Sequence, residues 1–207
     1  MENCSKSWKE IFVYESGLID PQPGFPSIKP GQLMYDNHLN ALNFVMSESS
    51  QLTSNSPLDI HRFLTKNVEF FERNNNSGQY RKSDVWIGHE LCPSPLILDN
   101  LMNHWFDITT KLVELNYLNM ISGLKVSSIS HHMFECIHPF IDGNGRTGRL
   151  LFNMIQKVCG EDPRIFYYKY RFSYYDEIQS FRDRFFTGTQ FLTDDIYEYY
   201  NLPPMES

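Results

Sequence analysis

The chain has 207 residues, of which 41% are hydrophobic and 15% aromatic, a composition that excludes a disordered chain and predicts one globular domain. Its net charge of −7 offers no basic face, so we expect no nucleic-acid partner. No apolar run approaches the length of a membrane-spanning helix and no signal peptide begins the chain, so we expect no membrane partner either.

The four cysteines are Cys4, Cys92, Cys136 and Cys159, and no two of them form a C-x-x-C pair. This spacing predicts reduced thiols and favours a cytoplasmic protein. Delivery of the chain into another cell as an effector stays open.

Residues 1–33 are predicted to form an N-terminal arm, because the prolines and glycines of "DPQPGFPSIKPG" forbid regular structure and suggest an extended segment laid on the domain. Residues 34–207 are predicted to form the main domain. Apolar residues at helical spacing predict a helix over residues 34–46, and a second helix follows, with Ser56 as its cap and Pro57 in its first turn. "ERNNNSG" is predicted to end that second helix.

The segment "YRKSDVWIGHEL" is rich in β-branched and aromatic residues and predicts a short strand or hairpin, a flap in an otherwise helical chain. Apolar stripes then predict helices over residues 95–116 and 125–135, and another in "RLLFNMIQKVCG" that ends at Gly160. "SYYDEIQSFRDRFF" and "TDDIYEYYNL" predict two final helices. The fold class is therefore all-α with one small β-hairpin.

The loop "HPFIDGNGRTGR", residues 138–149, carries the chemistry of the sequence. Its glycines let the backbone approach a ligand, and the helix that follows directs its N-terminal amides toward an anion. Arg146 and Arg149 can reach further phosphate oxygens, while Asp142 beside phosphates implies an intervening cation such as magnesium. His138 is placed to take a proton from a hydroxyl. Each element alone is also typical of an ordinary tight turn, but together they indicate phosphoryl or nucleotidyl transfer.

The same loop resembles the Fic family motif H-x-F-x-[D/E]-G-N-G-R-x-x-R at every specified position. "GQYRKSDVWIGHELCPSP" and "YYDEI" also resemble their counterparts in Fic proteins, so the resemblance covers roughly residues 34–190. It implies a compact helical fold with a hairpin flap, and transfer of AMP from ATP to a Ser, Thr or Tyr hydroxyl of a protein target, with magnesium as the metal.

The resemblance also implies residue roles. His138 would be the general base, Phe140 a buried anchor and Asp142 the magnesium ligand. The nucleotide would be bound by Asp142, Gly143, Asn144, Gly145, Arg146, Thr147, Gly148 and Arg149. Tyr174 and Tyr175 stand where relatives contact adenine or ribose, although ordinary helix packing explains them equally well. Arg182 stands where the family commonly has asparagine, which puts a further nucleotide contact in doubt.

The flap has a mechanism of its own in this interpretation. Its exposed strand edge can pair with an extended target segment through main-chain hydrogen bonds, which holds the target hydroxyl at the phosphate. The residues assigned to this role are Val85, Trp86, Ile87, Gly88, His89 and Glu90. The alternative is a hairpin packed on the body without a partner.

Two further features of the sequence concern a possible zinc site and a possible inhibitory helix. His131, His132, Cys136 and His138 together resemble a zinc ligand set, but His131 and His132 are adjacent and point to different sides of a helix, so core packing explains them better. Fic proteins often resemble one another in an inhibitory helix, [S/T]-x-x-x-E-[G/N], whose glutamate pairs with the second motif arginine. Here only Glu2 is followed by Gly or Asn. Either residues 1–33 carry a remnant of such a helix, because "ENCSKSWKE" resembles a Ser-capped helix start, and Glu2 is a candidate partner of Arg149, or Glu2 is a terminal residue without a role.

Three functions remain open from the sequence. The first is a protein adenylyltransferase, with self-modification and restraint by a small inhibitory partner protein as open possibilities. The second is the same scaffold with another outcome, such as transfer of another nucleotide or a phosphate, or removal of AMP from a modified protein. The third is a silent module that binds nucleotide or partner only. The intact loop favours the first.

Overall fold

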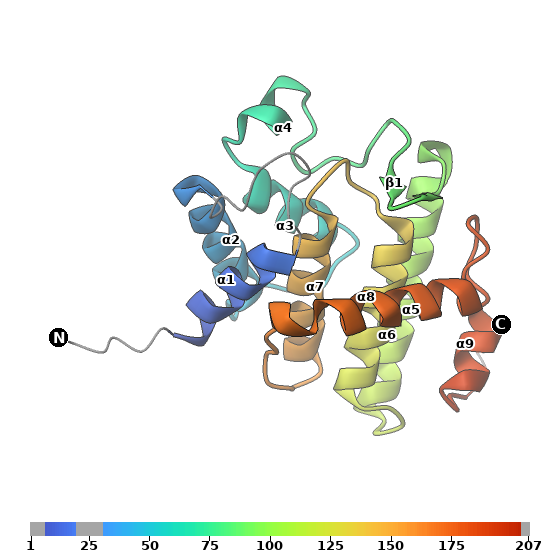
Figure 1. Ribbon diagram of the computed structural model, residues 1–207. Coiled ribbons are helices and arrows are strands. Elements are labelled where there is room, and N and C mark those ends of the chain that lie inside the picture. The colour runs from blue at the N-terminus through green and yellow to red at the C-terminus, as the bar shows by residue number, and fades with distance from the viewer. Residues whose placement is uncertain (1–6, 20–30, 204–207) are drawn as a thin grey trace.

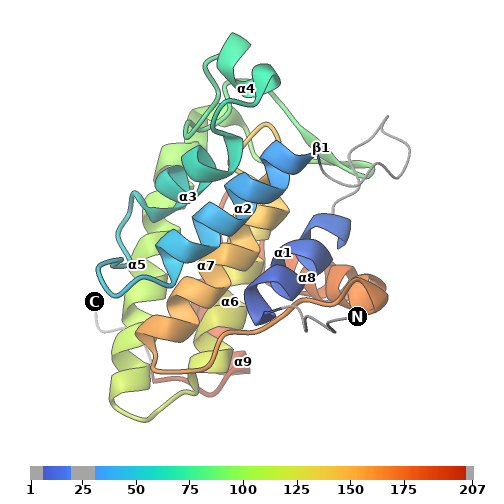
Figure 2. The same ribbon diagram turned by 90° about the vertical axis from the view of Figure 1, so that its left-hand side faces the viewer.

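Two helices at the centre of the molecule, α6 (Gly123–Ile137) and α7 (Asn144–Val158), pack side by side and are joined by residues 138–143. The computed structural model describes residues 7–19 and 31–203. Helix α5 (Leu98–Tyr117) packs against α6, and the pair α2 (Gln32–Val45) and α3 (Ser56–Thr65) packs against α7. In Figure 2 the axes of α5, α6 and α7 are roughly aligned, with α6 running in the direction opposite to the other two.

The remaining elements surround this bundle. Helix α8 (Arg171–Phe185) crosses α6, preceded by the 3₁₀ turn η2 (Tyr168–Tyr170), and α9 (Thr193–Tyr199) packs against it (Figure 1). The short helix α4 (Glu69–Arg73) and the strands β1 (Trp86–Ile87) and β2 (Glu90–Leu91) lie at the same end as residues 138–143. The 3₁₀ turn η1 (Pro95–Ile97) leads into α5. Within the described ranges the fold is thus all helical with one two-stranded hairpin, as the sequence predicted.

Apolar residues on the facing sides of α5, α6 and α7 form the core, and a few polar side chains fix how the helices meet. Trp105 of α5 is fully buried, and its indole N–H donates to the Ser130 carbonyl of α6 over 2.8 Å. Lys157 near the end of α7 donates to the carbonyls of Val45 and Ser47 over 2.9 and 2.8 Å. Because a lysine can satisfy the orphan carbonyls at a helix end, this contact fixes the C-terminus of α2 on α7.

The predicted helices are confirmed, with differences at their ends. The helix expected to run from Ser56 to "ERNNNSG" is instead two helices, because Asn67 takes a left-handed conformation with φ of 59° and separates α3 from α4. Asparagine tolerates this conformation better than other side chains. Ser56 is the first residue of α3 rather than its cap, which is Asn55. Gly160, with φ of 72°, follows the end of α7 as expected.

The largest departure concerns the N-terminal arm, which was expected to be extended. Residues Trp8–Ile19 form helix α1. Ser7 and Glu10 form a capping box, in which the Ser7 amide donates to the Glu10 carboxylate over 2.7 Å and the Ser7 hydroxyl accepts from the Glu10 amide over 3.4 Å. The buried face of α1 lies on α2, α7 and η2. The proline-rich stretch that suggested an extended arm, residues 20–30, lies outside the described residues.

Candidate functional site

Two left-handed residues bound the loop between the central helices. His138 ends α6 with φ of 52°, and Gly143 precedes α7 with φ of 81°. The first value is uncommon for any residue other than glycine, whereas glycine adopts the second without steric cost. The loop therefore reverses the chain in six residues and brings His138 close to the N-terminus of α7.

Phe140 and Asn144 lock the loop from inside. The Asn144 side chain accepts the Phe140 amide proton and donates to the Phe140 carbonyl, both over 2.8 Å. The Phe140 ring is fully buried, as expected, and stacks on the imidazole of His61 at a centroid distance of 3.9 Å. Asn144 thus contributes its side chain to the loop and leaves its backbone amide to the anion-binding end of α7.

His61 of α3 holds the other side of the loop. Its Nδ1 atom accepts the Gly78 amide proton over 3.0 Å, so Nε2 carries the ring proton and donates to the Asp142 carbonyl, also over 3.0 Å. Burial, the largest effect, lowers the pKa of His61 to about 4, with the nearby Arg146 charge acting in the same direction. His61 is therefore neutral at physiological pH, and its two hydrogen bonds require that state.

The Asp142 carboxylate faces the entrance of the site. One oxygen accepts the Gly143 amide proton over 2.6 Å, and the other lies 3.7 Å from the Arg146 guanidinium. The side chain is 42% exposed, so it is open to a ligand. Magnesium takes one or two carboxylates together with phosphate oxygens and water, and Asp142 fits as the single protein carboxylate of such a site.

The first turn of α7 supplies the anion-binding end. Thr147 is buried, and its hydroxyl donates to the Gly143 carbonyl over 2.9 Å. A Cβ atom at Gly148 would lie 2.1 Å from a carboxylate oxygen of Glu135 and 3.0 Å from the His131 ring, so a larger residue would force these side chains of α6 to move. Gly145 lies between Asn144 and Arg146 in the same turn, where the first amides have no partner inside the helix.

Arg149 is fully buried under α1. Its guanidinium donates to the Ser16 hydroxyl over 2.8 Å and to the Ser16 carbonyl over 2.9 Å. It also donates to the Tyr174 hydroxyl over 3.4 Å, which in turn lies 2.9 Å from Nε2 of His131. The Tyr175 hydroxyl donates to the Ile19 carbonyl of α1. Of the two tyrosines of α8, Tyr174 thus contacts Arg149 itself, and Tyr175 contacts α1, the helix that covers Arg149. Glu2 lies outside the described residues.

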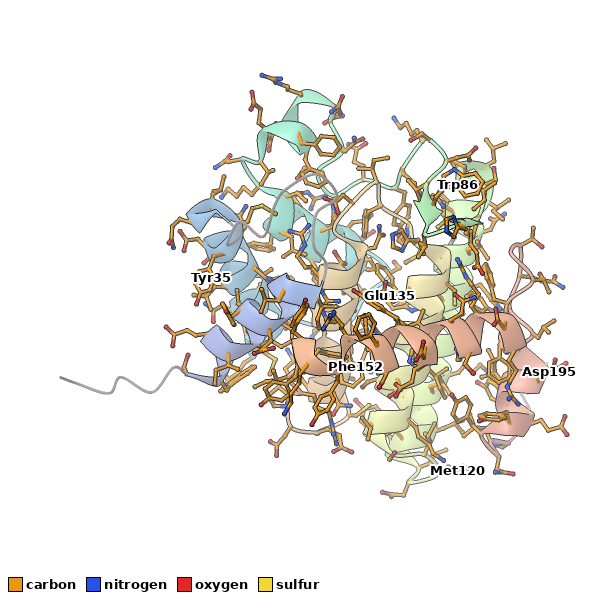
Figure 3. All side chains as sticks on the ribbon, in the orientation of Figure 1. Tyr35, Trp86, Met120, Glu135, Phe152 and Asp195 are labelled. Atoms are coloured by element: carbon orange, nitrogen blue, oxygen red, sulfur yellow. The ribbon has the colours of Figure 1, made fainter. Side chains whose placement is uncertain are left out.

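The flap is a two-residue hairpin at the same end of the molecule. Trp86 pairs with Leu91 and Ile87 with Glu90, and Gly88 and His89 form the turn. The Trp86 side chain projects outward at the upper right of Figure 3 and is 63% exposed. Val85, which precedes β1, accepts the Cys92 amide proton over 3.0 Å and closes the base of the hairpin.

Arg182 of α8 joins this flap to the helix before the loop. Its guanidinium donates to the Glu90 carboxylate over 2.8 Å and to the Cys136 carbonyl over 2.9 Å. The departure from the family's asparagine at this position therefore creates a link between β2 and the last turn of α6.

The histidines that resembled a zinc ligand set diverge. His131 faces Tyr174, whereas His132 lies against the Phe181 ring at a centroid distance of 5.3 Å. Across the described ranges, no group of three or more His, Cys, Asp or Glu side chains could hold a metal ion. No described helix is long and apolar enough to cross a membrane.

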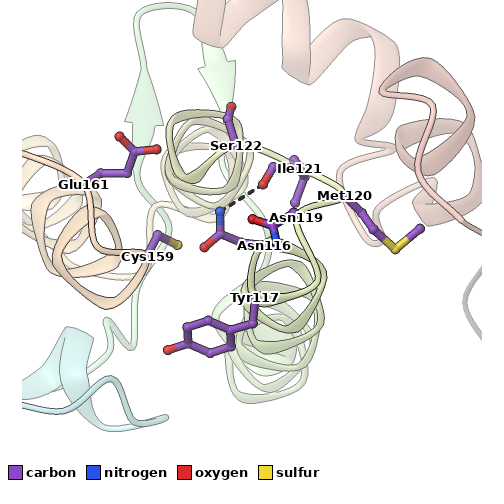
Figure 4. A pocket seen from close by; sticks show the side chains of 8 residues that line it. All are labelled: Asn116, Tyr117, Asn119, Met120, Ile121, Ser122, Cys159 and Glu161. Atoms are coloured by element: carbon purple, nitrogen blue, oxygen red, sulfur yellow. Dashed lines mark hydrogen bonds between the residues drawn. The ribbon is translucent and has the colours of Figure 1, made fainter.

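A surface depression of about 600 Å³ lies at the opposite end of the bundle, beside the turn between α5 and α6 (Figure 4). Asn116 lines it and donates to the Ile121 carbonyl over 2.9 Å, and Cys159 and Glu161 lie on its far side. None of residues 138–149 lines the depression, so the candidate site is the region around that loop.

Sequence reasoning missed several residues that the structure brings to the site. Ser16 was missed, because the helix start that the sequence offered as an alternative in the arm was not followed as far as residue 16. His61 and Arg81 gave no signal, because they hold the loop through backbone carbonyls far along the chain. His38 of α2 is buried, and its pKa is lowered well below the usual value, first by burial and then by the charges of Arg146 and Arg149.

The sequence profile of the Fic/DOC family matches residues 51–156, which contain α3, the flap, the loop and most of α7. The chain belongs to the Fic/DOC family. The helical fold and the loop geometry described above are consistent with this assignment.

Relatives with a curated name support the same family. The chain is 32% identical over 135 residues to "Protein adenylyltransferase Fic" of Aedes aegypti, covering 65% of this chain and 26% of that protein. It is 31% identical over 143 residues to the protein of the same name from Nematostella vectensis, covering 68% of this chain and 31% of that protein. The chain thus spans about a quarter to a third of the length of these relatives.

Solved structures show the same fold. A Fic domain containing signaling protein from Bacteroides thetaiotaomicron superposes with a TM-score of 0.71 at 18% identity, over 93% of this chain and 80% of that one. Fic-1 from C. elegans superposes with a TM-score of 0.61 at 20% identity, over 85% of this chain and 56% of that one.

Three buried histidines and the partly buried His132 predict a loss of stability in acid. The pKa values of His38, His61, His131 and His132 are lowered chiefly by burial, to about 4 for His61 and His132. The unfolded chain therefore binds more protons than the folded one below pH 6.5, and the free energy of unfolding should fall as pH falls from 6.5 toward 4. Urea unfolding at a series of pH values measures this slope.

The variant His61→Gln isolates one contribution. At pH 5 the free energy of unfolding of this variant should change less steeply with pH than that of the wild type, by the equivalent of about one proton. His89→Gln, at the exposed tip of the flap, is the matched control and should leave the slope unchanged. An equal slope in the wild type and His61→Gln would contradict a neutral, buried His61.

Proposed function

We propose that this chain is a protein adenylyltransferase that transfers AMP from ATP to a side-chain hydroxyl of a target protein. The observation that carries the proposal is the complete loop from His138 to Arg149, held in one arrangement at the N-terminus of α7. The relatives named above carry the name protein adenylyltransferase, which supports the same reaction. Because the chain spans only part of those proteins, their activity is a proposal for this chain.

The proposed reaction assigns a role to each group of the loop. The acceptor hydroxyl oxygen forms a bond to the α-phosphorus, the bond from that phosphorus to the bridging oxygen breaks, and pyrophosphate leaves. His138 takes the hydroxyl proton. The amides at the start of α7 and the Arg146 guanidinium stabilise the negative charge of the phosphates. Magnesium, when bound at Asp142, neutralises further phosphate charge, and no covalent enzyme intermediate is needed.

In this proposal the flap binds the segment of the target protein that carries the acceptor hydroxyl. Residues 86–90 lie exposed at the end of the molecule that carries the loop, and their strand edge can pair with an extended target segment. Trp86 and Ile87, both exposed, would contact that segment. Main-chain pairing demands little of the target sequence, so the chemical class of the partner is a protein with an exposed Ser, Thr or Tyr in an extended stretch.

Helix α1 restrains the site in this proposal. The Arg149 side chain, expected to hold the terminal phosphates, is fully buried and donates to Ser16 instead. Glu15, the residue before Ser16, accepts the Tyr168 amide proton over 2.8 Å and fixes α1 on η2. Productive binding of ATP therefore requires Arg149 to exchange its Ser16 contacts for phosphate contacts.

The variant His138→Ala tests the proposed function. Transfer of label from α-labelled ATP to protein, including self-modification, should be abolished, because the base is lost. Binding of ATP should persist, because the amides of α7 remain. His104→Ala, on α5 away from the loop, is the control and should transfer at the wild-type rate. Transfer that survives in His138→Ala would remove this residue from the mechanism, and label that arrives only from γ-labelled ATP would show phosphate transfer instead.

The variant Asp142→Asn tests the metal role without breaking the loop. The amide oxygen of asparagine can still accept the Gly143 proton, so the turn is preserved while the negative charge is lost. Transfer should fall by about tenfold or more and should need a higher magnesium concentration. Rates measured across a magnesium titration give the result. Wild-type transfer that persists in excess EDTA would contradict a magnesium-dependent site.

The variant Ser16→Ala tests the restraint. One of the hydrogen bonds that hold Arg149 away from the nucleotide is lost, so ATP should bind about fivefold or more tightly and self-modification should rise. Calorimetric titration with ATP measures the affinity. Ser127→Ala, which removes another buried serine hydroxyl without touching Arg149, is the control for general destabilisation. Weaker binding in Ser16→Ala would mean that α1 supports the nucleotide site rather than restrains it.

A further inference from the structure

Arg81 joins the flap to the catalytic loop. It precedes the flap in sequence, and its side chain is only 3% exposed. Its Nε atom donates to the His138 carbonyl over 2.8 Å, although the two residues are 57 positions apart. Its backbone amide donates to the next carbonyl of the loop, Pro139, over 2.9 Å. The residue therefore contacts the loop at two successive peptide groups.

The same guanidinium also holds both ends of the flap. Nη1 donates to the Ser83 carbonyl, before β1, over 3.1 Å, and Nη2 donates to the Pro93 carbonyl, after β2, over 2.6 Å. One planar group thus makes hydrogen bonds to the two stems of the hairpin and to His138. A planar guanidinium has its donors in a fixed fork, so these three carbonyls cannot move independently of one another without breaking a bond.

Packing alone does not explain why this buried position holds an arginine. A buried guanidinium is costly to desolvate, and all of its hydrogen-bond partners given above are carbonyl oxygens. An apolar side chain could fill the same space at lower cost. What only an arginine provides here is a rigid geometric relation between the hairpin and the residue that ends α6.

His138 is sensitive to that relation because of its backbone. Its left-handed conformation, with φ of 52°, is stabilised from outside by contacts such as the Arg81 bond to its carbonyl. If the backbone of His138 relaxes from this conformation, the direction of its Cα to Cβ bond changes and the imidazole moves with it. A shift of about 1 Å in a reacting group is enough to reduce a rate strongly.

We infer that Arg81 is a positioning residue that sets His138 relative to the acceptor chain held by the flap. The inference rests on the proposed function, because it assigns the base to His138 and the acceptor to residues 85–90. Arg182 provides a second bridge of the same kind, from Glu90 to the Cys136 carbonyl. A target segment that pairs with the flap therefore engages a hairpin whose position is tied to the end of α6 at two points, the carbonyls of Cys136 and His138.

The variant Arg81→Lys tests this role. Lysine keeps the charge but cannot reach the three carbonyls in one plane. At saturating ATP, self-modification should slow by about tenfold or more. The dissociation constant of ATP should change by less than about twofold, because the hydrogen bonds of Arg81 go to the loop before α7 and to the flap, not to the first turn of α7. Lys82→Met removes a charge from the exposed neighbour and is the matched control, with both quantities unchanged.

Amide hydrogen exchange gives a readout that does not depend on activity. Arg81→Lys should exchange faster than Lys82→Met both in the flap, residues 84–92, and in the loop, residues 138–142. Faster exchange in the flap alone would overturn the coupling, as would an unchanged transfer rate or an equal loss of ATP affinity. If the wild type transfers no AMP, the proposed function fails while these exchange data still decide the coupling.

The wild-type protein provides the same test if Arg81→Lys does not fold. The Cys92 amide reports opening of the flap base, because it donates to Val85, and the Arg81 amide reports opening of its bond to Pro139. If the guanidinium couples the two, both amides should exchange through one opening with the same free energy and the same response to denaturant. Separate openings would overturn the inference.

Discussion

The conformation of residues 138–143 is the constraint on which the rest of the site depends. A chain that must leave α6 and enter α7 within six residues needs left-handed backbone at both ends, which Gly143 provides freely and His138 adopts at a cost. The molecule meets that cost with directed hydrogen bonds from outside the loop. His61 binds the Asp142 carbonyl and Arg81 binds the His138 carbonyl, so the region between α3 and the flap serves as the scaffold of the loop.

Burial determines which side chains around the loop carry a charge. Arg146 and Arg149 lie beside histidines that burial keeps neutral, among them His38 and His131. A neutral imidazole next to a guanidinium adds no repulsion, and the pKa values of His38 and His131 are lowered partly because the arginines are there. The positive charge of the site therefore resides on the arginines and on the end of α7, where a triphosphate can use it.

The sequence predicted the parts of this structure that rest on local patterns. The loop motif places its chemical groups within twelve residues, and the long helices α5, α6 and α7 carry continuous apolar stripes. Helix α1 was predicted only as an alternative, a Ser-capped helix start in an otherwise extended arm, because the prolines after it dominated the interpretation of the whole segment. His61 and Arg81 could not be found in this way, because a side chain that binds a backbone carbonyl 81 or 57 positions away leaves no pattern in the sequence.

Helix α1 is part of the core as well as a cover for Arg149, and this limits how the restraint can be relieved. Its own side chains Phe12, Val13 and Ile19 are almost fully buried. Exposing three such side chains would cost about 1.5–3 kcal/mol each, or roughly 5–9 kcal/mol together. That sum is comparable with the whole stability of a typical domain, so detaching α1 to admit ATP would nearly unfold the protein. A rotation of the Arg149 side chain from Ser16 to a phosphate exchanges one set of charge-assisted hydrogen bonds for another and leaves the apolar face of α1 in place. Relief of the restraint is therefore expected to occur by rearrangement of Arg149 under a helix that stays docked.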